Sequence, residues 1–207
     1  MRWILRRGAA LLEGRSGRRI SHVFVMDVPT YSETLFITDA AINIFPDLDV
    51  KRDIIQNAID LWTDVGLGAP RVAILSAVET VTSKIPSTIE AAALCKMADR
   101  GQITGGILDG PLAFDNAIDP EAARIKGIES PVAGKAQILV VPDLEAGNML
   151  AKNLIFLSKA DAAGIVLGAR VPVILTSRAD SVRSRMASCA VAVLLADARR
   201  RTTSLKV

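Results

Sequence analysis

The sequence has few aromatic residues, few cysteines and a single histidine. Phe, Trp and Tyr together make up 4% of the 207 residues, whereas hydrophobic residues make up 50%. A core of Ala, Val, Ile and Leu is therefore expected, as in α/β proteins whose parallel strands are covered on both faces. The length allows one large domain, or one domain plus part of another, with a sizeable core.

The two cysteines and the histidine are placed too far apart to suggest a metal site. Neither Cys95 nor Cys189 has a second cysteine or a histidine at ligand spacing, so both are interpreted as reduced core residues of a cytoplasmic protein. We expect no metal. A Ser-His-Asp triad would depend wholly on His22, which we expect to point outward from a strand. The apolar run at 189–196 is too short to cross a bilayer, so no membrane partner is expected.

Positive charge is concentrated at the two ends of the chain, although the net charge is only +3. Basic ends can contact nucleic acid or acidic lipid. The aromatic and basic interleaving of a nucleic-acid surface is lacking, so we expect no nucleic-acid partner. Residues 1–18 are instead expected to form a frayed basic leader and residues 198–207 a solvated basic tail.

Strand and helix patterns alternate along the chain. Two runs rich in β-branched residues, 19–28 and 35–44, predict a hairpin, and helical spacing follows as far as Gly66. Further strands are expected at 71–77, 105–108, 136–141, 163–168 and 171–175, and helices at 87–98, 120–126, 145–158 and 180–196. Ser87 and Glu90 have the spacing of a capping box. The alternation predicts an α/β three-layer sandwich with a largely parallel sheet.

Ligands of open α/β sheets collect beyond the carboxyl ends of the strands, where helix amino-termini direct their N–H groups. That rule selects residues 76–79, 109–111, 142–148 and 176–181. In the second of these stretches, Asp109 stands in an Asp-Gly-Pro sequence that is typical of a structural turn.

The stretch 176–181 combines hydroxyl groups, a guanidinium and a predicted helix start. Arg178 could hold a phosphate through two parallel hydrogen bonds, while Ser177 or Thr176 could donate to a developing oxyanion. The helix dipole would favour the negative charge. The alternative is that Thr176 or Ser177 caps the last helix and Arg178 is merely solvated.

The stretch 142–148 offers a second set of polar groups. Asn148 could orient a ligand, with Lys152 one helical turn further as a cation. The alternative is a strand-to-helix loop in which Asp143 or Glu145 serves as a first-turn acid.

Several motifs resemble the phosphate acetyl/butyryltransferase family. In chain order they are VAILS at 72–76, GPL at 110–112, SPVAGKA at 130–136, VPDLEAGN at 141–148 and LTSRADS at 175–181. The likeness extends from about Arg18 to Ala196. Three segments are closer in sequence to the butyryltransferase-like branch: the TSRADS motif and residues 25–29 and 36–43. The sequence is also similar to the phosphate acyltransferase part of bifunctional enoyl-CoA hydratase/phosphate acetyltransferase proteins.

The resemblance implies a reversible transfer of an acetyl or butyryl group between coenzyme A and inorganic phosphate. The acyl-CoA thioester and phosphate would be substrates, no cofactor would be permanently bound, and a homodimer is expected. Ser177 and Arg178 would lie at the acyl-phosphate and thioester site. Seven residues after that serine, where some members carry an aspartate as the thiol base, this chain has Ser184. Asp180 is therefore the nearest substitute, although an ordinary aspartate pKa of about 3.9 matches a thiol near 8.5 poorly.

The expected site thus consists of three catalytic and four substrate-binding residues. The catalytic residues are Ser177, Arg178 and Asp180, and the substrate-binding residues are Thr176, Ser181, Asn148 and Lys152.

The resemblance also implies an isocitrate/isopropylmalate dehydrogenase-like fold that is truncated at its amino terminus. Residues 19–170 would form a unit like domain II, and residues 171–197 the carboxy-terminal part of an otherwise missing domain I. A non-catalytic remnant that binds coenzyme A or phosphate, or that dimerises, is the alternative function. A metal-dependent β-decarboxylating dehydrogenase is disfavoured, because its acidic metal ligands and cofactor motif are not recognisable.

Overall fold

The computed structural model describes residues 17–204, with side chains placed as far as residue 201. Nearly all of the expected leader and the last residues of the expected tail lie outside this range. The elements are β1 Ser21–Asp27, β2 Leu35–Thr38, α2 Leu48–Asp64, β3 Arg71–Leu75, α3 Pro86–Asp99, β4 Ile107–Leu112, α4 Phe114–Ile118, α5 Pro120–Ile125, β5 Ile138–Val140, α6 Leu144–Phe156, β6 Asp161–Leu167, β7 Val173–Ile174 and α7 Val182–Ser204.

Within the described residues the strands form one seven-stranded sheet in the order β4-β3-β5-β2-β1-β6-β7. The strands from β4 to β2 pair in parallel, whereas β1 is antiparallel to both β2 and β6, and β7 is antiparallel to β6. The α/β class is therefore confirmed, but the sheet is mixed and not largely parallel. The physical reason is loop length, because residues 28–34 and 168–172 are too few for the crossover that parallel neighbours require.

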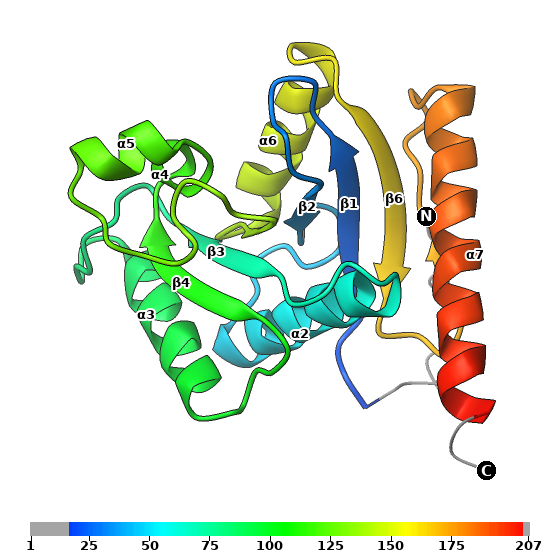
Figure 1. Cartoon of the computed structure of the whole chain (residues 1–207), viewed down its shortest axis with the longest axis horizontal. Coiled ribbons are helices and arrows are strands. Elements are labelled where there is room, and N and C mark those ends of the chain that lie inside the picture. Colours follow the sequence, from blue (N-terminus) through cyan, green and yellow to red (C-terminus); the bar gives the residue numbers. More distant parts are fainter. Residues whose placement is uncertain (1–16, 205–207) are drawn as a thin grey trace.

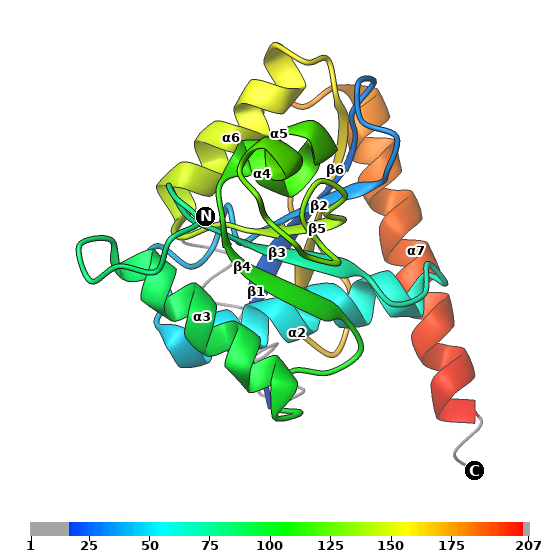
Figure 2. The same cartoon turned by 60° about the vertical axis from the view of Figure 1, so that its left-hand side comes forward.

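Helices cover both faces of the sheet (Figures 1 and 2). The helices α2, α3 and α7 contribute to one buried cluster, which includes Val23 and Phe36. The helices α4 and α6 contribute to another, which includes Met26 and Ile37. Alternate residues of the same strands enter opposite clusters, as the period of a strand requires. Burying each such side chain stabilises the fold by about 1.5–3 kcal/mol.

Three local predictions differ from the structure. Helix α3 begins at Pro86 without a side-chain cap, so the capping box is wrong. The reason is that the Ser87 hydroxyl bonds the Ser76 hydroxyl instead, at 2.8 Å. Strand β4 runs on to Leu112, so Asp109 lies inside a strand and not in a turn. Helix α7 starts at Val182 and continues beyond residue 196.

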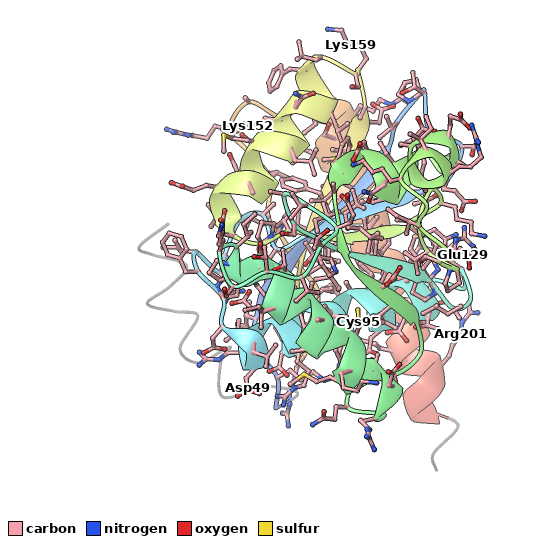
Figure 3. All side chains as sticks on the ribbon, turned by 90° about the vertical axis from the view of Figure 1, so that its left-hand side faces the viewer. Asp49, Cys95, Glu129, Lys152, Lys159 and Arg201 are labelled. Carbon is pink, nitrogen blue, oxygen red and sulfur yellow. The ribbon has the colours of Figure 1, made fainter. Side chains whose placement is uncertain are left out.

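The two cysteines occupy different environments. Cys95 on α3 is half-buried (Figure 3), and burial raises the pKa of its thiol to about 12. Cys189 on α7 is exposed, so its assignment to the core was wrong. The reason is that α7 is apolar on more than the face that packs on the sheet, which leaves residues such as Met186 and Val193 exposed as well.

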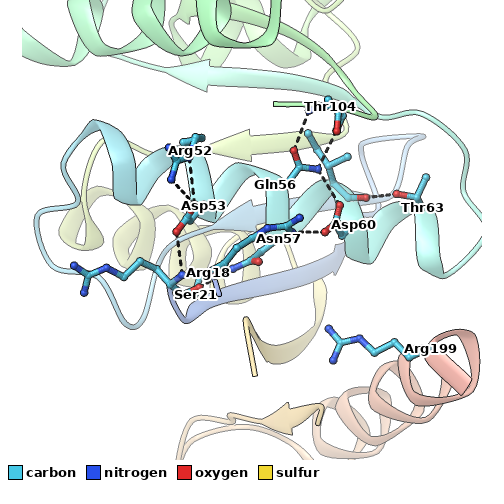
Figure 4. Close-up of polar contacts among 12 residues, drawn as sticks. Arg18, Ser21, Arg52, Asp53, Gln56, Asn57, Asp60, Thr63, Thr104 and Arg199 are labelled. Atoms are coloured by element: carbon cyan, nitrogen blue, oxygen red, sulfur yellow. Dashed lines mark hydrogen bonds and ion pairs between the residues drawn. The ribbon is translucent and has the colours of Figure 1, made fainter. Parts of the chain in front are cut away.

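Helix α2 is fixed to the sheet by polar contacts as well as by its buried stripe (Figure 4). The Asn57 side-chain amide donates to the Ser21 hydroxyl at 3.0 Å, on β1. The Gln56 side chain bonds both backbone groups of Thr104, at 2.9 and 3.0 Å, in the loop before β4. These contacts position β1 and β4 relative to the same helix.

Candidate functional site

The loop after β2 is built around a buried carboxylate. Asp39 is 3% exposed and accepts hydrogen bonds from the backbone amides of Ala41, Ile42 and Asn43 at 2.9, 3.1 and 3.2 Å. The Asn43 side-chain amide donates a fourth, at 2.6 Å. Several donors that converge on one charged acceptor fix the backbone of this loop.

Asn148 extends that arrangement onto the first turns of α6. Its side-chain amide donates to the Ala40 carbonyl at 3.3 Å, and so it lies just beyond the carboxyl end of β2. Asp143 caps α6 by accepting from the Ala146 amide at 2.8 Å, as the alternative reading of this stretch expected. Lys152, further along α6, points outward into solvent (Figure 3).

The residues between β7 and α7 form a tight turn. The Asp180 carboxylate accepts from the Ser177 backbone amide at 2.6 Å, and the Asp180 amide donates to the Ser177 carbonyl at 3.2 Å. The Ser177 hydroxyl accepts from the Ala179 amide at 3.3 Å. The side chain of Ser181, and not that of Thr176 or Ser177, accepts from the Ser184 amide at 3.1 Å at the start of α7. The alternative in which Thr176 or Ser177 caps this helix is therefore wrong.

Arg178 stands exposed at the tip of this turn. Its backbone carbonyl accepts from the Arg185 guanidinium at 3.4 Å. Within residues 17–201, no carboxylate lies within ion-pair distance of the Arg178 guanidinium, which therefore keeps its donors available for an anion.

The two groups of expected site residues follow different strands of the sheet, β7 and β2. Because β7 is antiparallel to β6, the chain leaves β7 beside the amino-terminal half of β6. Arg183, near the start of α7, pairs with Asp161, the first residue of β6, at 2.7 Å. The turn 176–181 thus follows β7, an edge strand that is antiparallel to its neighbour, whereas Asn148 lies beyond β2 in the middle of the sheet. The expectation that both stretches follow carboxyl ends of parallel strands is wrong for this turn.

His22 is fully buried, so the expectation that it points outward from the strand is wrong. Burial lowers the pKa of the imidazole to about 4, although the Asp39 carboxylate, the Leu175 carbonyl and the Asp180 carboxylate act in the opposite direction. Neither ring nitrogen meets hydrogen-bond geometry with any described residue. The apolar residues at consecutive positions directly after His22, Val23–Val25, are the sequence signal for a strand with apolar side chains on both faces.

A groove of about 740 Å³ lies between α6, the α4–α5 segment and the β1–β2 loop. Its apolar walls include Val28, Leu35, Phe114 and Leu154. The Tyr31 hydroxyl on its rim donates to the Ala136 carbonyl at 2.6 Å, and burial raises the pKa of Tyr31 to about 12. None of the seven expected site residues lines this groove.

Among the described residues, no three His, Cys, Asp or Glu side chains are grouped so that they could hold a metal ion. No helix in residues 17–204 is both long and apolar enough to span a bilayer.

Comparison with known proteins identifies the relatives of this chain. It is 83% identical to the phosphate acetyltransferase of Rhizobium meliloti over 186 residues, which are 90% of this chain and 59% of that protein. It is 49% identical to the probable phosphate butyryltransferase of Bacillus subtilis over 179 residues, 86% of this chain and 60% of that protein. The chain thus spans about three fifths of the length of these relatives.

The fold comparison agrees. The crystal structure of a branched-chain phosphotransacylase from Enterococcus faecalis V583 superposes with a TM-score of 0.81 at 34% identity, over 89% of this chain and 66% of that one. The sequence pattern of the family described as phosphate acetyl/butaryl transferase matches residues 3–193. The resemblance found in the motifs is confirmed, and the chain belongs to the phosphate acetyl/butaryl transferase family.

Proposed function

We propose that this chain carries phosphate acyltransferase chemistry, the reversible transfer of an acetyl or butyryl group between coenzyme A and inorganic phosphate. The family match across residues 3–193 carries this proposal, together with relatives that bear both the acetyl and the butyryl name. The exposed turn at Ser177 and Arg178 supplies groups that suit the reaction.

The reaction is a direct displacement. A phosphate oxygen attacks the thioester carbonyl carbon, the carbon–sulfur bond breaks, and the thiolate leaves or takes a proton. Arg178 binds the phosphate through two parallel hydrogen bonds, and the Ser177 hydroxyl donates to the oxyanion that develops on the carbonyl oxygen. Positioning of the two substrates and stabilisation of this charge account for most of the reduction in the activation barrier.

Asp180 acts through the backbone in this proposal. Its carboxylate is bonded to the Ser177 amide, so it holds the turn and contributes a local negative charge instead of moving freely as a base. Ser184, in the first turn of α7, shares a hydrogen bond with the Ser181 hydroxyl and cannot take a proton near neutral pH. Departure of the thiolate without a dedicated base fits both observations.

The remaining expected residues would bind the rest of the substrate. Thr176 and Ser181 flank the reactive turn, whereas Asn148 and Lys152 belong to α6 and would contact another part of the substrate, such as coenzyme A. We include in the proposal the domain division at residue 170, the isocitrate/isopropylmalate dehydrogenase-like architecture and a homodimer.

The test is phosphate-dependent release of thiol from acetyl-CoA and butyryl-CoA. Arg178→Ala should lower kcat/KM by roughly 100-fold or more, because it removes a charged contact to the phosphate in the transition state. The matched control is Arg183→Ala, since that side chain is exposed and its ion pair with Asp161 is on the surface. It should change kcat/KM by less than about twofold.

Two results would contradict the proposal. Thiol release that does not depend on phosphate removes the assigned reaction, and equal effects of Arg178→Ala and Arg183→Ala remove the assigned site. Binding of coenzyme A in calorimetry without turnover supports the alternative, a binding remnant.

A further inference from the structure

His22 lies in the antiparallel part of the sheet, enclosed on all sides. It belongs to β1, opposite Val166 of β6, and none of its surface is exposed. Its ring packs edge-on against Phe24, with ring centroids 4.4 Å apart. On the backbone side, its carbonyl accepts from the Thr38 hydroxyl at 2.8 Å, so the residue is fixed at both ends.

Because Gly164 on β6 has no side chain, a gap remains between the His22 ring and the residue that follows β7. A Cβ at this position would overlap the Leu175 carbonyl oxygen and would lie 3.0 Å from His22 Nε2. The ring nitrogen and that carbonyl oxygen therefore border the same gap. The Gly164 amide donates to the Ser188 hydroxyl at 2.9 Å, so α7 meets the sheet at this point too.

Leu175 is the first residue beyond the β6–β7 ladder, which ends at the pairing of Ile165 with Ile174. It is followed directly by Thr176 and Ser177. Any contact that fixes the Leu175 carbonyl consequently fixes the start of the turn that carries Ser177 and Arg178.

The buried imidazole has one unused donor. Burial favours the neutral ring, which has one N–H donor and one acceptor nitrogen. The polar groups facing it are the Asp39 carboxylate beyond β2, the Leu175 carbonyl beyond β7 and, with the smallest effect, the Asp180 carboxylate of the turn. Of these, the Leu175 carbonyl borders the same gap as Nε2.

We propose that His22 is a positioning residue for acyl transfer, whose Nε2–H donates to the Leu175 carbonyl and holds the Ser177–Arg178 turn in its reactive position. The proposal rests on the proposed function of that turn. His22 acts only through Leu175 and does not contact the reacting atoms.

The first test uses the fact that His22 is the only histidine of the chain. In the full chain without an added histidine tag, labelled with ¹⁵N, long-range proton–nitrogen correlation at pH 7 should show one neutral ring with its proton on Nε2. A proton on Nδ1, or a charged ring, would overturn the proposal.

The second test compares His22→Leu with His22→Gln. Leucine removes the donor, whereas the glutamine amide nitrogen can occupy the position of Nε2. Loss of positioning should lower kcat roughly 100-fold in His22→Leu, with less than about a twofold change in KM for acyl-CoA. His22→Gln should recover kcat to within about tenfold of the unsubstituted chain. Equal losses in both variants, or none in His22→Leu, would mean that the ring only fills space.

Folding failure and failure of the proposed function remain distinguishable. If His22→Leu does not fold, His22→Asn replaces it, because its shorter amide reaches only the Nδ1 position and should not recover kcat. If the unsubstituted chain shows no phosphate-dependent turnover, the proposed function fails. The backbone amide resonances of Ser177 and Arg178 then decide positioning: they should shift in His22→Leu and not in His22→Gln, and unchanged resonances in both would overturn it.

Discussion

The buried carboxylate in the parallel half of the sheet and the buried imidazole in the antiparallel half differ in their hydrogen bonding. In the parallel half, from β4 to β2, the buried Asp39 carboxylate has four N–H donors, and Asn148 donates to the neighbouring loop. In the antiparallel half, β1, β6 and β7, the buried His22 ring has no partner that meets hydrogen-bond geometry among the described residues. Arg178 at the end of this half is exposed.

This difference distinguishes polar groups whose hydrogen bonds hold the fold from polar groups that remain available for a functional contact. Satisfied buried groups such as Asp39 hold a loop in one conformation. Unsatisfied buried groups are costly and are therefore found where a function retains them. The comparison thus directs attention to His22, which lies against the strand end that leads into the turn at Ser177 and Arg178.

The largest effect on stability is expected in the parallel half, from Asp39→Ala. The substitution leaves the amides of Ala41, Ile42 and Asn43 without their charged acceptor, and each bond to a charged group is worth about 1.5–3 kcal/mol. The free energy of unfolding, measured with urea, should therefore fall by about 4 kcal/mol or more. Asp47→Ala, which removes an exposed cap of α2, should cost only about 1 kcal/mol. Similar losses in the two variants would show that the Asp39 loop is not a rigid unit.

A smaller effect is expected in the antiparallel half, from acid. The pKa of His22 is lowered from 6.5 to about 4 in the folded chain, so between these values the unfolded state binds more protons. The free energy of unfolding should therefore decrease as the pH is lowered through this window. At pH 5 the decrease from this residue alone should be about 2 kcal/mol. Urea unfolding between pH 7.5 and 5 should show a shallower decline in His22→Leu. Parallel declines in the two proteins would mean that His22 titrates normally.

Much of the fold could be predicted from local pattern. The hairpin of β1 and β2, helix α2 and the strands β3, β5 and β6 follow from apolar period and length. The direction of the strands could not be predicted in the same way. Residues 163–168 and 171–175 form two similar apolar runs, and such runs occur in parallel and in antiparallel strands alike. Only the short link between them indicates the antiparallel pairing of β6 with β7.

The site was harder to predict because its position depends on that pairing. The motif at 175–181 identified the turn from sequence alone, but the turn follows the antiparallel edge strand β7 and not a parallel strand. His22 was missed because an imidazole in a strand is commonly at the surface. Its burial depends on Gly164 and Leu175, which are more than 140 residues away in sequence and give no local signal.

The smallest effects are expected from the helix caps of the two halves. Asp143→Ala and Ser181→Ala each remove an oxygen that accepts a backbone amide, at 2.8 Å in α6 and 3.1 Å in α7. Each should cost about 1 kcal/mol in thermal or urea unfolding, with the charged cap of α6 costing more because it also interacts with the helix dipole. Thr176→Val is the control, since Thr176 does not cap α7, and it should change stability by less than about 0.5 kcal/mol. If Thr176→Val costs as much as Ser181→Ala, the start of α7 is held from within the turn, and the Ser177–Arg178 segment is then part of the helix boundary and not a free anion-binding tip.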